Sequence, residues 1–150
     1  EAVAEHLCLH KNLTVMTNGL NIALALSQAE RVDVLLTGGT LRKKSLSFYG
    51  PQAEQSLQHF LFDKVVLGVD SFNLHTGLST HFEAEATLNR LMCKAAREVI
   101  VVTDSSKFDQ QCFHLIARPE QVHTLVTDAG ISEGQVQALE SQGIRVLIIQ

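Results

Sequence analysis

The chain has 150 residues, of which 45% are hydrophobic and 19% are charged, and its net charge is −4 at pH 7. This composition is typical of one globular domain and excludes an intrinsically disordered chain. No apolar run reaches the roughly 18 residues of a membrane-spanning helix, and the net negative charge argues against a nucleic-acid-binding face.

The first part of the chain predicts alternating helices and strands. The expected elements are a helix over residues 2–9, a strand with its turn over 13–19, a helix over 20–30, a strand with its turn over 32–40 and a helix over 51–62. Pro51 occupies a favoured first helical position, and Leu57, Phe60 and Leu61 share one face of that last helix. Residues 40–50 alternate apolar residues with serines and predict either a short extra strand or a loop.

The alternation continues to the end of the chain. The expected elements are a strand over 63–72, a helix over 82–98, a strand over 98–103, a strand over 121–130, a helix over 132–142 and a strand over 144–150. Thr80-x-x-Glu83 and Ser132-x-x-Gln135 match capping boxes, and Gly143 ends the last helix. This order predicts a single α/β domain over 1–150, with a mostly parallel sheet and helices on both faces.

Five of the predicted strands end in small polar residues. These endings are Thr17-Asn18-Gly19, Thr37-Gly38-Gly39-Thr40, Gly68-Val69-Asp70-Ser71, Thr103-Asp104-Ser105-Ser106-Lys107 and Thr127-Asp128-Ala129-Gly130. The carboxyl ends of parallel strands lie along one edge of a sheet, where open α/β proteins bind ligands. Carboxylates and Asn18 suit hydroxyl groups, whereas backbone N–H groups and Lys107 suit a phosphate. The alternative is that each loop only caps the helix that follows it.

Several motifs together resemble, in order and spacing, the C-terminal effector-sensing domain of DeoR-family bacterial sugar-operon repressors. They are "LTVMTNGLNIA", "LLTGGTLRKKSLSFYGPQAE", "FDKVVLGVDSFNLHTGLST", "REVIVVTDSSKF" and "VHTLVTDAGI". The resemblance implies a fold similar to ribose-5-phosphate isomerase and the CoA transferases. It also implies a phosphorylated sugar or sugar alcohol as effector, and operator DNA as a partner through an N-terminal helix-turn-helix.

Two parts of that family are missing from residues 1–150. One is the helix-turn-helix domain. The other is a first strand with an Asp-Ser-Gly-Thr-Thr-type loop, which would precede the helix at 2–9 and cradle a phosphate. The chain also starts at Glu1 within an expected helix and without Met, so we expect it to be a piece of a longer protein.

The candidate effector-binding residues are drawn from these strand endings and from the start of the helix at 82–98. They are Thr17, Asn18, Gly38, Gly39, Asp70, Glu83 and Lys107. Each has a structural alternative. Lys107 could be a solvated loop lysine, Asp70 a turn aspartate, and Glu83 the third helical residue of a capping box. The glycine pair could serve only the turn, which glycine alone accommodates easily.

The sequence predicts no metal site and no cofactor. His75 and His81 are six residues apart, and the sequence has no C-x-x-C pair that would complete a zinc site. Cys8, Cys93 and Cys112 show no C-x-x-C spacing, so we expect free thiols in a cytoplasmic protein, with Cys93 in the core.

Two functional hypotheses remain at this point. The first is a sensor and oligomerisation domain without enzymatic activity or membrane contact. It would form a homodimer or homotetramer, because a helix-turn-helix reads paired half-sites. The alternative is a sugar-phosphate isomerase in which Asp70, Glu83 and Lys107 abstract a proton beside a carbonyl and stabilise an enediolate.

Overall fold

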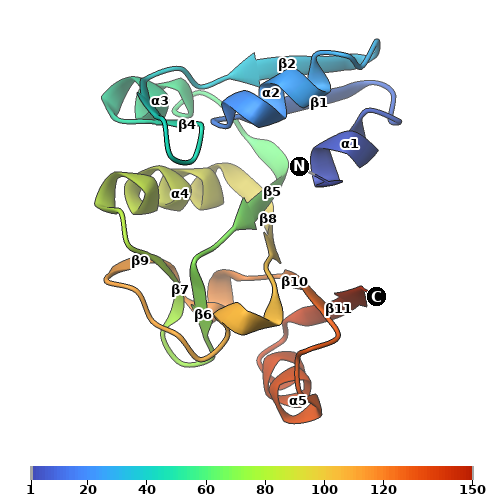
Figure 1. Ribbon diagram of the computed structural model, residues 1–150, viewed down its shortest axis with the longest axis vertical. Coiled ribbons are helices and arrows are strands. Elements are labelled where there is room, and N and C mark those ends of the chain that lie inside the picture. The colour runs from blue at the N-terminus through green and yellow to red at the C-terminus, as the bar shows by residue number, and fades with distance from the viewer. Residues whose placement is uncertain (1, 150) are drawn as a thin grey trace. The chain divides into compact units, whose positions relative to one another are not determined.

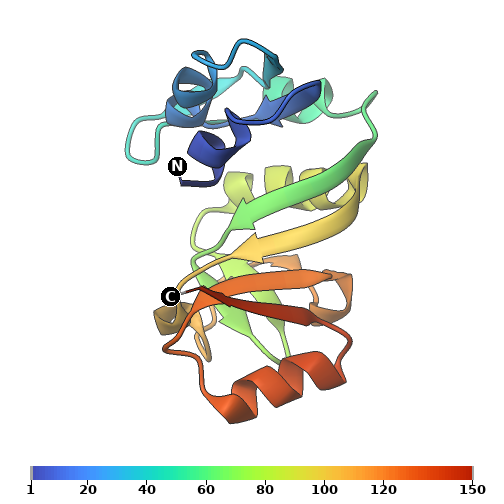
Figure 2. The same ribbon diagram turned by 90° about the vertical axis from the view of Figure 1, so that its right-hand side faces the viewer.

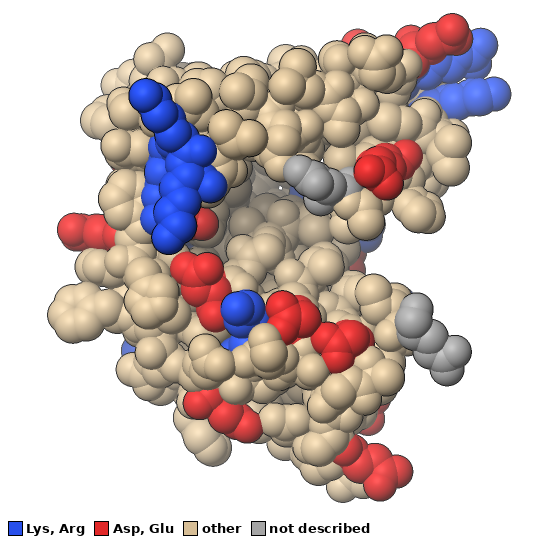
Figure 3. Space-filling model, viewed as in Figure 1, with Lys and Arg blue, Asp and Glu red and all other residues tan. Residues whose placement is uncertain are grey.

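The computed structural model describes residues 2–149, which form two compact units (Figure 1). Unit 1 is Glu1–His59 and unit 2 is Phe60–Gln150. The excess of negative charge belongs to unit 2, which has 11 acidic and 7 basic residues. Figure 3 shows Asp and Glu side chains spread over the visible face of unit 2.

Unit 1 is built on two parallel strands. Its elements are α1 (Ala2–Leu7), β1 (Leu13–Thr17), α2 (Leu20–Leu26), β2 (Val32–Leu36), β3 (Thr40–Arg42), β4 (Ser47–Tyr49) and α3 (Pro51–Ser56). β1 pairs with β2 in parallel, with Leu13 opposite Val32. A small core forms where Ala4 of α1 and Leu26 of α2 pack against Val32.

In two segments, residues 40–50 and residues 51–62, the observed elements differ from those predicted. The serine-rich segment forms an antiparallel hairpin of β3 and β4, rather than a loop or a single strand. The helix predicted over 51–62 ends at Ser56, whose hydroxyl donates to the carbonyl of Ala53 and so competes with helix continuation. Leu57, Phe60 and Leu61 all lie beyond this helix, so the prediction that they share one of its faces is wrong; Leu57 is buried, whereas Phe60 and Leu61 are 39% and 87% exposed.

Unit 2 contains a four-stranded parallel sheet in the order β11-β10-β8-β5 (Figure 2). Its elements are β5 (Phe62–Gly68), β6 (Ser71–Asn73), β7 (Gly77–Thr80), α4 (Glu83–Ala95), β8 (Ala96–Val102), the 3₁₀ turn η1 (Ser105–Lys107), β9 (His114–Ala117), the 3₁₀ turn η2 (Pro119–Gln121), β10 (Thr124–Asp128), α5 (Glu133–Ser141) and β11 (Arg145–Ile149). The predicted α/β class with a mostly parallel, helix-flanked sheet is confirmed. Residue 150, at the end of the last predicted strand, lies outside the described residues.

One face of this sheet carries the main core. Strand alternation points Leu67, Val101 and Leu125 to that face, where they join Ala86 of α4 and Leu139 of α5 in one cluster. The opposite face carries the partly exposed side chains of Val66, Leu147 and Ile149. At the ends of these strands, side chains on one face of the sheet are therefore buried in the core, and those on the other face are open to solvent.

A second sheet in unit 2, of β6, β7 and β9, was not predicted separately, because its strands are only three or four residues long. It is antiparallel, and it buries Phe72 and Leu78 in the main core. Gly77 at the start of β7 has φ +101°, and a Cβ there would lie 2.0 Å from the carbonyl oxygen of Ala117. Only glycine fits where these two strands approach.

The two predicted capping boxes have different outcomes. Ser132 and Gln135 form the expected reciprocal hydrogen bonds at the start of α5. The box predicted from Thr80 at α4 is wrong, because the N-cap residue is Phe82. The Thr80 hydroxyl instead donates to the carboxylate of Asp70 at 2.6 Å. That contact ties the end of β7 to the loop after β5.

Candidate functional site

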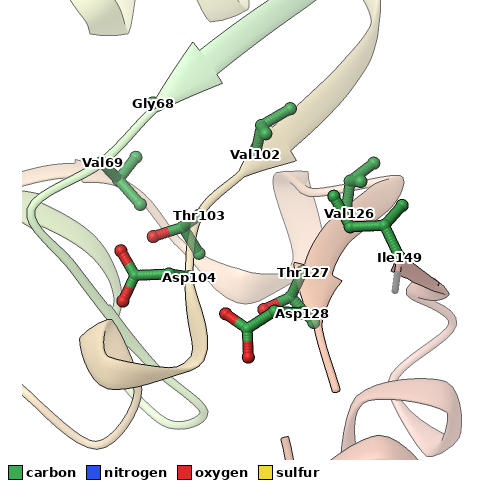
Figure 4. A pocket seen from close by; sticks show the side chains of 9 residues that line it. All are labelled: Gly68, Val69, Val102, Thr103, Asp104, Val126, Thr127, Asp128 and Ile149. Carbon is green, nitrogen blue, oxygen red and sulfur yellow. The ribbon is translucent and has the colours of Figure 1, made fainter. Parts of the chain in front are cut away.

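The carboxyl ends of the four parallel strands surround a cleft of about 390 Å³ (Figure 4). Its lining residues come from the ends of β5, β8, β10 and β11 and from the loops that follow them. They are Gly68, Val69, Val102, Thr103, Asp104, Val126, Thr127, Asp128 and Ile149. Valine and isoleucine side chains form the walls, and two carboxylates lie together beside them. Such a surface suits a small molecule with C–H faces and hydroxyl groups.

Asp128 holds two of the strand endings together. Its carboxylate accepts hydrogen bonds from the backbone N–H of Ser105 at 2.8 Å, from the Ser105 hydroxyl at 2.7 Å and from the N–H of Gly130 at 2.8 Å. The Ser105 contacts, followed by the Gly130 N–H, lower the pKa of Asp128 because they favour the ionised form. Asp128 is therefore an anion that joins the loop after β8 to the loop after β10.

Asp104 caps the turn η1 that follows β8. Its Oδ1 accepts the N–H of Ser106 at 3.0 Å and also the Ser106 hydroxyl. The Ser106 hydroxyl, then the Ser106 N–H and then the positive charge of Lys107 lower the pKa of Asp104. Asp104 is exposed, so its charge is available to a ligand in the cleft.

Thr127 contributes a buried hydroxyl at the end of β10. Its side chain is 2% exposed, and among the described residues no hydrogen-bond partner reaches its Oγ1. Strand alternation places Val126 and Asp128 on the open face of the sheet and Thr127 with Leu125 on the covered face. A buried hydroxyl without a partner costs free energy of folding.

Two of the three predicted site residues of unit 2, Asp70 and Lys107, lie in loops that follow the parallel strands β5 and β8, and Glu83 follows β7. Asp70 follows β5 and is held by Thr80, Glu83 is the exposed first residue of α4, and Lys107 is the half-buried last residue of η1. The described lining of the cleft includes none of these three.

The four predicted site residues of unit 1 come from the adjacent ends of β1 and β2. The Thr17 hydroxyl accepts the N–H of Gly19 at 3.0 Å, and the Asn18 amide donates to the carbonyl of Phe48 at 3.1 Å. Gly38 and Gly39 have φ of +67° and +110°. Each of the four residues therefore has a structural role: Thr17 and Asn18 hold the backbone of neighbouring segments, and Gly38 and Gly39 adopt backbone angles that favour glycine.

Two residues of the cleft, Asp104 and Asp128, were not among the named candidates. Both belong to strand endings recognised in the sequence, and both directly follow a threonine at the end of a buried strand. That repeated Thr-Asp pattern was the signal that could have identified them. Among residues 2–149, no group of three or more histidine, cysteine or acidic side chains could hold a metal ion.

Comparison with known proteins identifies the family. The family model described as the DeoR C terminal sensor domain matches residues 1–129. The chain belongs to the DeoR sensor-domain family. The resemblance first seen in the strand endings is thereby confirmed over most of the chain.

Several curated relatives of this DeoR-family domain are transcriptional regulators by name. A protein named "Putative aga operon transcriptional repressor" of Escherichia coli O157:H7 is 48% identical over 140 residues, which are 93% of this chain and 52% of that relative. The HTH-type regulator YulB of Bacillus subtilis strain 168 is 39% identical over 137 residues, 91% of this chain and 53% of YulB. The glycerol-3-phosphate regulon repressor of Escherichia coli K12 is 29% identical over 146 residues, 97% of this chain and 58% of that protein.

The DeoR-family chain thus spans about half the length of the curated relatives it matches. The relatives favour the regulatory hypothesis over the isomerase alternative, since their names describe transcriptional regulators and repressors. Within the described part of the chain, no helix combines the length and apolar character needed to cross a membrane.

Proposed function

We propose that this chain is the effector-sensing part of a bacterial repressor of a carbohydrate-utilisation operon, and that its effector is a phosphorylated sugar or sugar alcohol. The observation that carries the proposal is the cleft at the carboxyl edge of the unit 2 sheet, in a chain of the DeoR sensor family. The edge where parallel strands end is the usual ligand-binding position in open α/β folds.

The cleft suits the hydroxyl groups and carbon chain of such a ligand better than its phosphate. Asp104 and Asp128 are both anions, and they would repel a phosphate placed between them. They are good acceptors for sugar hydroxyls, and the walls of Val102 and Val126 suit the C–H faces of the carbon chain. The phosphate belongs instead beside Lys107, the cation of the same loop.

We propose the remaining candidate residues as further effector contacts in each unit. Asp70 and Glu83 supply further acceptors near the start of α4. In unit 1, taken by itself, we propose Thr17, Asn18, Gly38 and Gly39 as residues that contact an effector, through the Asn18 amide and the backbone of the two glycines. A loop of the Asp-Ser-Gly-Thr-Thr type upstream of residue 1 would complete the phosphate site.

The effector acts on DNA binding through linkage. A ligand that binds one conformation more tightly shifts the population toward it, and the shift is limited by the difference between the two affinities. The operator would be bound by a helix-turn-helix domain upstream of this chain, in a cytoplasmic homodimer or homotetramer that sets the half-site spacing. The acidic unit 2 is unsuited to that role itself.

A binding experiment with one matched pair of variants tests the cleft. Isothermal titration calorimetry would compare sugar phosphates and sugar-alcohol phosphates with the same compounds lacking phosphate. Asp104→Asn removes a charge but keeps an acceptor that can cap η1, and we expect it to weaken binding of the phosphorylated ligand about 10-fold or more. Asp63→Asn, at the opposite end of β5, should leave binding unchanged. Equal dissociation constants for wild type and Asp104→Asn would exclude this cleft as the effector site.

A further inference from the structure

Unit 2 contains a thiol and an imidazole in direct contact, away from the described lining of the cleft. The Sγ atom of Cys112 lies 3.3 Å from Nε2 of His81. Cys112 belongs to the loop between η1 and β9, and His81 directly follows β7. The backbone N–H of Cys112 donates to the Ser79 hydroxyl at 2.9 Å, which fixes the residue beside β7.

Cys93 provides an internal comparison, because the two cysteines are almost equally buried. Cys112 is 8% exposed and Cys93 is 7% exposed. Burial raises the pKa of the Cys93 thiol to about 11, as expected for a thiol desolvated within the core. What distinguishes Cys112 is the contact of its sulfur with a ring nitrogen of His81.

The position of the pair also gives a reagent a way in. His81 is exposed, and the loop residues on both sides of Cys112 are exposed as well, including Phe113 at 90%. The thiol therefore lies just beneath the surface, whereas Cys93 is on α4 within the main core. The exposed residues on either side of Cys112 leave its thiol closer to solvent than the thiol of Cys93.

We propose that Cys112 is a site of covalent modification by small hydroperoxides, with His81 as its base. His81 accepts the thiol proton, and the thiolate sulfur attacks one oxygen of hydrogen peroxide. An S–O bond forms as the O–O bond breaks, which gives a cysteine sulfenic acid and a hydroxide that takes the proton back from His81 to form water. The cysteine is oxidised by two electrons and the peroxide is reduced.

The test measures sulfenic acid formation at each cysteine of the intact protein. Hydrogen peroxide would be added at pH 7 in the presence of dimedone, which traps sulfenic acids, and peptides would be quantified by mass spectrometry. We expect Cys112 to be trapped at least about tenfold faster than Cys93. His81→Gln should slow trapping at Cys112 about tenfold, because the variant lacks the base that accepts the thiol proton. His75→Gln, an exposed histidine at the β6–β7 turn, is the matched control and should have no effect.

A pH series separates a base from a merely steric neighbour. If His81 acts as the base, the ratio of the trapping rates of wild type and His81→Gln should fall as the pH rises, because hydroxide in solution can then take the thiol proton instead. A rate ratio that stays constant with pH would show that His81 only controls access, and it would overturn the proposal. Equal trapping of Cys112 and Cys93 in the wild type would overturn it without any variant.

Discussion

The carboxylate of Asp128 accepts two hydrogen bonds from Ser105, one from its backbone N–H and one from its hydroxyl, at 2.8 and 2.7 Å. These two residues are 23 positions apart, at the ends of the neighbouring strands β10 and β8. A carboxylate that faces the cleft is thus also a structural tie between the loops that form it. Asp128 can therefore affect both the stability of the chain and the charge of the cleft.

The hydrogen bonds of Asp128 predict a stability that depends on pH. Its pKa is lowered in the folded chain, so its stabilising contribution is present above the pKa of an unfolded aspartate, about 3.9. That contribution is lost as the pH falls through the lower folded pKa. We expect Asp128→Ala to lower the melting temperature at pH 7, and the difference from wild type to shrink as the pH falls below the pKa of an unfolded aspartate. Thermal unfolding by circular dichroism between pH 2.5 and 7 measures both; a difference independent of pH would contradict the role of the charge.

Much of the fold could be predicted because the long elements carry a clear period. α4 and the parallel strands β8 and β10 follow apolar patterns of helix and strand type, and their predicted bounds differ from the structure by a few residues. The short strands β6, β7 and β9 could not be separated from loops, since three or four residues define no period. Pairing between residues distant in sequence, such as Leu78 with Ala117, stabilises them instead.

The candidate site was predictable only in its location. The strand endings pointed to the carboxyl edge of the sheet, and the cleft lies at that edge. Which residue of each ending faces the cleft depends on side-chain direction, and this follows from register rather than from residue type. Asp104 and Asp128 face it, whereas Asp70 is held by Thr80 in a contact that joins the loop after β5 to the end of β7.

The orphan hydroxyl of Thr127 predicts a stabilising substitution. Thr127→Val keeps the shape of the side chain and removes a buried hydroxyl that has no described partner. We expect the free energy of unfolding to rise by about 1 kcal/mol, as measured by urea denaturation. Thr124→Val is the matched control on the same strand, because the Thr124 hydroxyl donates to Glu98 at 3.4 Å and its loss should give no gain. A decrease for Thr127→Val would mean that its hydroxyl has a partner after all.

Two glycines should respond in opposite directions to the same substitution. Gly77→Ala places a Cβ 2.0 Å from a backbone carbonyl at a φ of +101°, so we expect destabilisation by more than about 1 kcal/mol. Gly134→Ala lies in α5 with nothing within 4 Å of the new Cβ, and it should stabilise by roughly 0.5–1 kcal/mol. Chemical denaturation of both variants measures this; a tolerated Gly77→Ala would show that β7 and β9 can separate at low cost.

Lys107 provides the most direct test of how the effector is held. It ends the turn that Asp104 caps, and it is the cation that we place against the effector phosphate. A hydrogen bond to a charged group contributes about 1.5–3 kcal/mol, so Lys107→Ala should weaken binding of a phosphorylated ligand roughly 10- to 100-fold. Binding of the same ligand without its phosphate should not change.

The comparison needs a control for the loss of positive charge. Lys94→Ala removes an exposed lysine from the last turn of α4, and it should bind the phosphorylated ligand like wild type. The stability of Lys107→Ala should stay within about 0.5 kcal/mol of wild type, as is usual for surface substitutions. In the full-length repressor, Lys107→Ala should still bind the operator but no longer respond to the effector. Unchanged effector affinity in calorimetry would leave Lys107 as a loop lysine, and the phosphate contact would have to come from the backbone of the other strand endings.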